Sequence, residues 1–419
     1  MNVKPFEEYE SKVRSYCRKF PAVFDKAKGS YLYDEDGNKY LDFFCGAGAM
    51  NYGHNNDFIK KRVIEYIEND GVMHALDMYT KAKREFIEYF EDNILKPRGL
   101  NYLIQFPGPT GTNAVEAALK LARKVKKRNT VFALMGAFHG MTVGALELTT
   151  DAESRAGAGV SLGNVVHIPA PYMFPGLDTV EYMERLITDD HSGANLPAAI
   201  VIETVQAEGG IHVLDVDYLK AVRALCDKYG IIMIVDDIQV GCGRTGYFFS
   251  FERAGIKPDM VCLSKSIGGF GTPFALTLIS PEFDVWAPGE HNGTFRGFQI
   301  AMVAAKAGLE QMNELKVDKQ AQEKAKIVEK VLGEGLQKID ERISYRGIGL
   351  IWGVDFDAFG DNASKLVIKK CFEKGLICES AGRGNRVVKL MPQLLISEDE
   401  LREGLNIFLE ATKEALKEL

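Results

Sequence analysis

The sequence predicts an α/β protein with a large, doubly wound and mostly parallel sheet domain and a smaller α+β domain assembled from both chain ends. Between residues 130 and 280, short apolar runs alternate with helical stretches, which is the order of βαβ units. Towards both ends the pattern changes to hairpin sequence and charged amphipathic helices. We expect residues 1–57 and 306–419 to form the small domain and residues 58–305 the large one.

Six apolar runs are the expected strands of the large sheet. They are short, rich in β-branched residues and apolar on both faces, as strands buried in a parallel sheet are. The runs lie at residues 130–135, 164–170, 198–205, 231–238, 259–264 and 274–280. Amphipathic stretches between them, such as VDYLKAVRALCDKYG, are the expected crossover helices.

The two chain ends carry different signals. Residues 29–44, GSYLYDEDGNKYLDFF, place the turn sequence DGN between two β-rich flanks and so predict a hairpin. Residues 316–339 read as a charged amphipathic helix, and ISYRGIGLIWGVDF as a strand pair. A closing helix follows, with Ser397 and Glu400 as its capping box.

Composition excludes several classes of partner. The net charge is −7 over 419 residues, the wrong sign for a protein that binds nucleic acid or an anionic membrane surface. The seven cysteines are odd in number and show no CxxC spacing, which predicts reduced thiols and neither a disulfide framework nor a zinc site. The N-terminal residues include no apolar run. We therefore expect a cytoplasmic protein that binds small molecules.

Residues 106–124, FPGPTGTNAVEAALKLARK, predict an anion site. Apolar residues at helical spacing indicate a helix that begins near Thr112. The preceding loop, residues 108–111, would leave backbone N–H groups free at the positive end of that helix, where phosphate or carboxylate binds. An ordinary glycine-rich turn is the alternative. No Gly-Lys-Ser/Thr follows, which argues against a P-loop ATPase despite the aspartates that end IIMIVDD.

Two charged residues follow buried strands. Asp236 lies near the end of the run 231–238, where a carboxylate points into the crevice of an α/β sheet, although a helix cap is the alternative. Lys265 follows the run 259–264 and precedes a glycine-rich turn; most lysines are solvated, but a desolvated one loses its proton and attacks carbonyl groups. The two lie 29 residues apart, about one βαβ unit. A phosphate site, a carboxylate and a lysine are what pyridoxal phosphate requires.

From about residue 20 to its end, the chain resembles the fold-type I, class III (ω-amino) aminotransferases. The resemblance implies pyridoxal 5'-phosphate as the cofactor and a homodimer with shared active sites. It is carried by the segments DEDGNKYLDF, GPTGTNAVEAALKLAR, FHGMT, ETVQAEGG, VDDIQVGCGRTG, LSKSIGG, NGTFRG and RGIGLIWGVDF.

The resemblance also implies roles around the cofactor. Lys265 would carry it as a Schiff base and shuttle the proton, and Asp236 would pair with the pyridine N–H. Phe138 and Ile238 would cover the ring faces, although both also suit core packing. The remaining cofactor contacts would be Thr110, Gly111 and Thr112 at the phosphate, His139 beside Phe138, Gln239 at the phenolic oxygen, and Thr294 at the phosphate in the neighbouring subunit.

At the substrate the chain departs from the family pattern. Many members bind the α-carboxylate of glutamate with an arginine, and Lys389 stands at that place, although it could also be a solvated strand-edge charge. A lysine is a point charge without the guanidinium fork, so Arg386 or Arg296 could take over. Glu208 matches the glutamate that alternately pairs with this cation, and Glu203 would lie behind it.

The segments AMNYGHNN, FHGMTVGALELT and PGEHNGTFRG narrow the expected reaction. They are similar to those of a transaminase of ectoine biosynthesis that moves an amino group from L-glutamate to the aldehyde of L-aspartate 4-semialdehyde. Alternatives within the same fold are an aminotransferase for 4-aminobutyrate or ornithine, and an aminomutase, which needs no 2-oxoglutarate. A binding protein that lost its chemistry is a further alternative, against which Lys265 and Asp236 both argue.

Overall fold

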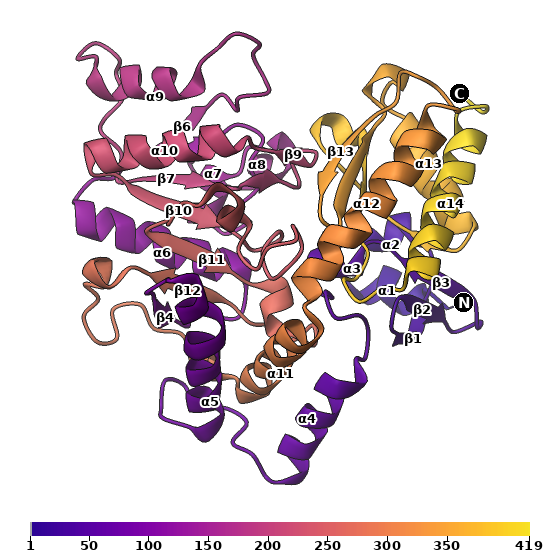
Figure 1. Ribbon diagram of the computed structural model, residues 1–419, viewed down its shortest axis with the longest axis horizontal. Helices are drawn as coiled ribbons and strands as arrows, with labels where there is room; N and C mark the ends of the chain where they lie inside the picture. Colours follow the sequence, from indigo (N-terminus) through magenta and orange to yellow (C-terminus); the bar gives the residue numbers. More distant parts are fainter. Residues whose placement is uncertain (1) are drawn as a thin grey trace.

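The computed structural model describes residues 2–419, and its larger part is built on a seven-stranded sheet (Figure 1). Strands β6, β5, β7, β10 and β11 are parallel neighbours, as predicted. In sheet order the strands are β4 (Leu103–Gln105), β12 (Leu276–Ile279), β11 (Met260–Leu263), β10 (Ile232–Asp236), β7 (Ala199–Ile202), β5 (Val131–Leu134) and β6 (Val165–Ile168).

The expectation of parallel strands was wrong at one edge of this sheet. The run at 274–280 does form a strand, β12, but it pairs antiparallel with both β11 and β4. Strand β4 was not predicted, because its short sequence LIQ is half exposed and forms no apolar run. The fold class itself, α/β with a large and mostly parallel sheet, is confirmed.

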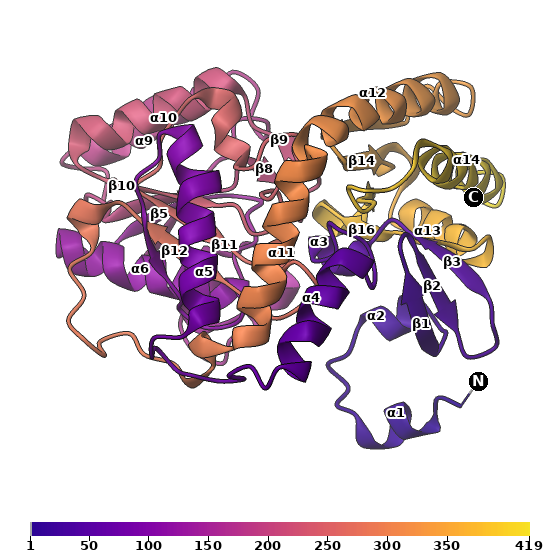
Figure 2. The same ribbon diagram turned by 60° about the horizontal axis from the view of Figure 1, so that its bottom comes forward.

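Helices cover both faces of the large sheet, and alternate side chains of each strand explain why. On β10, Ile232 and Ile234 pack with the apolar face of α6 (Gly111–Lys126). Met233 and Val235 belong to the core on the other side, where α10 (Val216–Tyr229) packs. Figures 1 and 2 both show the sheet between these two helices. A strand buried on both faces holds the residue at its end in a fixed place.

Strands from both chain ends share one sheet in the smaller part. The predicted hairpin is confirmed as β2 (Tyr31–Asp34) and β3 (Lys39–Asp42), and β3 pairs in parallel with β15 (Leu376–Ile377). The other strands of this part are β1 (Phe24–Lys28), β13 (Ser344–Ile348), β14 (Ile351–Asp355), β16 (Glu379–Ala381) and β17 (Val387–Leu390). The second sheet has the order β13-β14-β17-β16.

Three helices accompany these small sheets: α12 (Val317–Leu336), α13 (Ala363–Glu373) and α14 (Glu398–Ala415). The predicted capping box, Ser397 with Glu400, begins α14. Helix α11 (Gln299–Leu315) runs along the larger part and continues into α12 after a break at Lys316, where φ is +49° (Figure 2). The domain boundaries at residues 57 and 305 stay a prediction.

The other helices are short or lie at the periphery. They are α1 (Lys4–Tyr9), α2 (Tyr16–Lys19), α3 (Cys45–Gly48), α4 (Asp57–Glu68), α5 (Lys81–Phe90), α7 (Val143–Leu148), α8 (Ala152–Ala156) and α9 (Thr179–Thr188). Strands β8 (Val205–Gln206) and β9 (His212–Val213) form a small antiparallel pair. Across residues 2–419, every helix is too short or too polar to span a membrane.

Candidate active site

A cavity of about 330 Å³ opens at the carboxyl ends of β10 and β11. This is the edge at which open α/β sheets bind ligands. Of the residues expected at the cofactor, all except Thr294 lie on its wall. The wall consists of Thr110, Gly111, Thr112, Phe138, His139, Gly140, Met141, Glu203, Val205, Glu208, Asp236, Ile238, Gln239, Val240 and Lys265.

Lys265 lies just past β11, at the start of a short 3-10 helix. Its backbone has φ +54°, a left-handed conformation that non-glycine residues adopt at a cost and that gathers at functional sites. The preceding Ser264 donates a hydrogen bond to the carbonyl of Phe274 (2.7 Å), which ties this turn to the sheet. Burial lowers the pKa of the Lys265 amine. A buried amine of lowered pKa is a nucleophile and a proton acceptor.

Asp236 ends β10 and is only 5% exposed. Its Oδ2 lies 2.7 Å from Nδ1 of His139, and its Oδ1 accepts a hydrogen bond from the Ile238 N–H. Burial lowers the pKa of His139, but the hydrogen bond and charge of Asp236 outweigh it and raise that pKa above its usual value. His139 was expected beside Phe138; the structure also makes it the hydrogen-bond partner that orients Asp236.

The start of α6 has the geometry expected of an anion site. Thr110 caps the helix together with Asn113, and helix geometry leaves the N–H groups of Gly111 and Thr112 without an intrahelical acceptor. A Cβ at Gly111 would lie 2.9 Å from Cδ1 of Ile238, so only glycine allows this approach. N–H groups at the positive end of a helix suit a phosphate.

Two more carboxyl groups are buried near Asp236. Glu203 accepts a hydrogen bond from the Phe138 N–H (3.2 Å), and burial raises the pKa of Glu203 to about 8. Asp237 accepts a hydrogen bond from the Ser250 N–H (2.9 Å), and burial raises its pKa to about 7. Burial therefore disfavours the charged form of both groups, which limits the negative charge that they add to this end of the cavity.

Lys389 lies on β17 with its side chain completely buried. Its Nζ is 2.5 Å from Oε1 of Glu208, 2.9 Å from Oε1 of Glu379 and 3.3 Å from Oε1 of Gln239. Burial lowers the pKa of the Lys389 ammonium, but the two carboxylates outweigh it and hold that pKa above its usual value. The alternative of a solvated strand-edge charge is therefore wrong.

Glu208 connects the cluster formed by Lys389, Glu379 and Gln239 to the cavity. Its side chain is 32% exposed and lines the cavity wall. The Gln239 amide donates to Glu208 (3.0 Å) and to the carbonyl of Ala47 (3.1 Å). Gln239 thus joins the glutamate–lysine cluster, and its expected contact with the phenolic oxygen of the cofactor stays a prediction.

Three candidate residues lie elsewhere within one protomer. Thr294 is exposed, and its carbonyl accepts a hydrogen bond from His74. Arg296 pairs with Asp77. Arg386, the other possible carboxylate ligand, pairs with acidic groups at the protein surface, those of residues 357 and 361.

Sequence reasoning missed Glu379. It sits directly opposite Lys389 in the antiparallel register of β16 and β17. A signal was present, because a glutamate interrupts the otherwise apolar stretch LICESA ten residues before Lys389. A lone charge in a buried strand requires a partner of opposite charge.

The comparisons with known proteins agree with this geometry. Residues 13–412 match the family model described as Aminotransferase class-III. The chain belongs to this family. It is 52% identical to a diaminobutyrate–2-oxoglutarate transaminase from Streptomyces coelicolor and 48% identical to one from Sporosarcina pasteurii. Each alignment covers 98% of this chain and 97% of the relative.

Solved structures give the same fold. An ornithine aminotransferase from Toxoplasma gondii, reported with partial occupancy of PLP at its active site, superposes with a TM-score of 0.85 and 25% identity. That match covers 99% of this chain and 94% of the other. An S-selective transaminase from Arthrobacter sp. gives a TM-score of 0.88 at 22% identity, with 98% and 97% covered.

This class-III aminotransferase is a transaminase whose cofactor is pyridoxal phosphate, so the predicted enzyme class and cofactor are confirmed. The cavity fits the cofactor: α6 offers free N–H groups for the phosphate, Asp236 a carboxylate for the ring nitrogen, and Lys265 an amine for the aldehyde. When bound, pyridoxal phosphate supplies an electron sink for the carbanion formed at the substrate carbon.

Proposed function

We propose that this aminotransferase moves the amino group of L-glutamate to L-aspartate 4-semialdehyde, giving L-2,4-diaminobutyrate and 2-oxoglutarate. Relatives at about half identity over nearly their whole length carry the name of that reaction. The observation that carries the proposal is the buried Lys389 ammonium, closed off from the cavity by Glu208.

This ion pair suits two substrates of different charge. Glutamate has a carboxylate on the carbon that reacts, whereas the aldehyde carbon of the semialdehyde bears none. Glu208 neutralises Lys389 when the aldehyde or ω-amine end enters, and moves aside when the carboxylate of glutamate arrives. One cavity thereby serves both halves of the reaction, because the charge on Lys389 is never left without a partner.

The cofactor end supplies the proton transfers. The Lys265 amine, favoured in its neutral form by burial, takes the proton from the substrate carbon and returns it at the other end of the reacting unit. Asp236, held by His139, keeps a proton on the ring nitrogen of the cofactor. Phe138 and Ile238 cover the ring faces.

We further propose that the active sites are shared in a homodimer, with Thr294 at the phosphate site of the neighbouring subunit. Exposed apolar side chains gather next to Thr294, as an interface would require. They are Val72, Met73, Leu76, Met78, Tyr79 and Phe295.

We also propose a cytoplasmic location. The free thiols of the seven cysteines support it, because such thiols persist in a reducing compartment.

A screen of amino acceptors with glutamate as donor tests the proposed reaction. The holoenzyme is incubated with L-aspartate 4-semialdehyde, succinic semialdehyde or L-glutamate 5-semialdehyde, and each product is identified by mass. We expect L-2,4-diaminobutyrate to form fastest, with one 2-oxoglutarate per product. Faster turnover of another aldehyde would replace the proposed substrate, and product formation without glutamate would indicate an aminomutase.

Two alanine variants identify the group that receives the carboxylate of glutamate. We expect Lys389→Ala to raise KM for glutamate by about tenfold, with a smaller effect on the semialdehyde, because a bound carboxylate is held about equally in ground and transition states. Arg296→Ala is the comparison, since Arg296 could reach the site across a dimer interface. If only Arg296→Ala impairs the glutamate half-reaction, the carboxylate is bound by the partner subunit.

A further inference from the structure

The two carboxylates that contact Lys389 have different surroundings. The side chain of Glu208 is 32% exposed and lies on the cavity wall, in the connection between β8 and β9. That of Glu379 is only 4% exposed and lies on β16, directly opposite Lys389 in the sheet register. A ligand in the cavity therefore meets Glu208 first, while Glu379 is held behind the ammonium.

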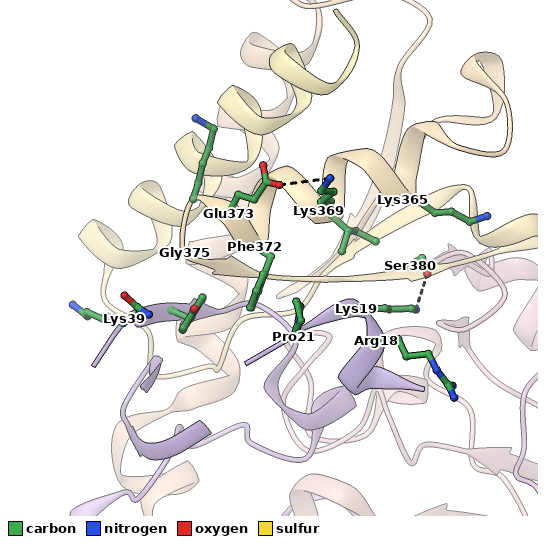
Figure 3. Close-up of a pocket in the computed structure, with 14 residues that line it drawn as sticks. Arg18, Lys19, Pro21, Lys39, Lys365, Lys369, Phe372, Glu373, Gly375 and Ser380 are labelled. Carbon is green, nitrogen blue, oxygen red and sulfur yellow. Dashed lines mark hydrogen bonds and ion pairs between the residues drawn. The ribbon is translucent and has the colours of Figure 1, made fainter. Parts of the chain in front are cut away.

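Glu379 lies on the edge strand β16, which β17 and one side-chain contact hold in place. Strand β16 pairs with β17 through all three of its residues, so the sheet fixes the height of Glu379 relative to Lys389. The next residue, Ser380, accepts a hydrogen bond from Lys19 (3.1 Å) at a separate surface pocket of about 850 Å³ (Figure 3). Because neighbouring residues of a strand point to opposite faces, this contact secures β16 without occupying Glu379.

A buried lysine needs such a fixed partner. An arginine in the same place would stay charged in any surroundings, but a desolvated lysine loses its proton readily. If Glu208 were the sole counter-ion, its movement would leave the Lys389 ammonium buried and unpaired until a ligand replaced it, which is costly. The second carboxylate removes that difficulty.

Other charged groups near Lys389 cannot take this role. Lys265 is an amine and supplies no negative charge. Burial, with help from Glu379 and Glu208, raises the pKa of the Tyr16 phenol to about 12, so that phenol is neutral. Burial also raises the pKa of Glu379 despite Lys389, and the charge of Glu208 adds to this rise. When Glu208 moves away, its repulsion disappears and Glu379 pairs more firmly with Lys389.

We propose that Glu379 is the permanent counter-ion of Lys389 and Glu208 the exchangeable one, so that Lys389 stays protonated and in place while the carboxylate of glutamate displaces Glu208. Glu379 is thus a positioning residue that allows a lysine to do the work of an arginine. The inference rests on the proposed role of Lys389 in the glutamate half-reaction.

Binding of glutarate to the holoenzyme tests this role without any reaction, because glutarate has the carboxylates of glutamate but no amine. Calorimetry at pH 7 and pH 9.5 gives the dissociation constants and, with buffers of different ionisation enthalpy, the protons taken up. In the wild type we expect little pH dependence and no proton uptake. In Glu379→Gln we expect the dissociation constant to rise about tenfold between these pH values, with proton uptake at pH 9.5, because Lys389 then has Glu208 as its single counter-ion and holds its proton less firmly.

Three further variants separate this role from a structural one. Glu379→Asp keeps the charge and should behave as the wild type. In the double variant Lys389→Arg with Glu379→Gln, the pH dependence should vanish, because a guanidinium stays protonated. Glu373→Gln makes the same exchange on the exposed end of α13 and serves as the matched control.

Two results would overturn the inference. One is a flat pH dependence in Glu379→Gln; the other is an affinity loss in that variant which is equal at both pH values and remains in the double variant. The half-reaction of the wild type with glutamate is measured first, because its failure would defeat the proposed function and not the role of Glu379.

Discussion

The two ends of the cavity are constructed differently. At the cofactor end, Asp236 and Lys265 extend from neighbouring strands of the large sheet, and Asp236 has one close charged partner, His139. At the carboxylate end, Lys389 comes from the small sheet and shares its charge between two glutamates. The first end lies within one sheet, whereas the second joins two parts of the chain.

This difference separates the chemistry from the choice of substrate. Strands buried on both faces fix the distance between Lys265 and Asp236, as proton transfer requires. The cluster around Lys389 contains more than one possible pairing, and Glu208 can change partner without moving the sheet. We therefore expect the cofactor end, called the fixed end below, to carry the reaction common to the family. We expect the Lys389 end, called the adjustable end, to select the substrates.

The largest expected effect is at the fixed end, in Lys265→Ala. Without this amine the cofactor has no covalent attachment, and the reaction has no group that shuttles the proton. We therefore expect turnover to fall by about 10⁴-fold. Borohydride reduction followed by peptide mapping should place the wild-type adduct on Lys265. Lys257→Ala, an exposed lysine three residues before β11, is the control. An adduct on a different lysine would refute the assignment.

Asp236→Asn should have the next largest effect, because the amide cannot hold the ring nitrogen protonated. We expect turnover to fall by about 10²-fold, equivalent to about 2.7 kcal/mol, while the cofactor stays attached. The neighbouring Asp237→Asn is the matched control: Asp237 accepts a hydrogen bond from the Ser250 N–H, which the amide oxygen of asparagine can also accept, and burial already disfavours the charged form of this carboxyl. Similar turnover in the two variants would show that Asp236 does not serve the ring.

The sequence predicted the fixed end better than the adjustable end, for a physical reason. Asp236 and Lys265 each follow an apolar run, so local sequence alone places them at strand ends. The partnership of Glu379 with Lys389 depends on which strands pair and in what register, which is a non-local property. The antiparallel direction of β12 escaped prediction in the same way, because a buried apolar run looks alike in either direction.

A smaller effect, on cofactor binding, is expected from a change at Thr294, which lies outside the cavity of its own protomer. If the partner subunit supplies Thr294 to the phosphate, Thr294→Val should weaken cofactor binding by about tenfold, the value of one hydrogen bond to a charged group. Equilibrium dialysis against pyridoxal phosphate measures this, and sedimentation should show a dimer. The exposed Thr188→Val, at the end of α9, is the control. A fully active monomer would contradict the shared site.

The smallest effect concerns stability at the fixed end, through Glu203. Burial raises the pKa of this carboxyl from 4.5 to about 8 in the folded protein. Between these values the unfolded chain has already lost the proton that the folded chain retains, so this group lowers the stability of the fold as pH rises through the window.

Glu203→Gln cannot ionise, yet its amide oxygen can still accept the hydrogen bond from the Phe138 N–H. We therefore expect the melting temperature of the apoprotein variant, relative to wild type, to increase by about one degree from pH 5 to pH 8.5, on the order of 1 kcal/mol. Scanning calorimetry at both pH values measures the difference, with the exposed Glu153→Gln as control. A variant whose relative melting temperature falls with pH would mean that Glu203 is ionised and paired in the folded protein.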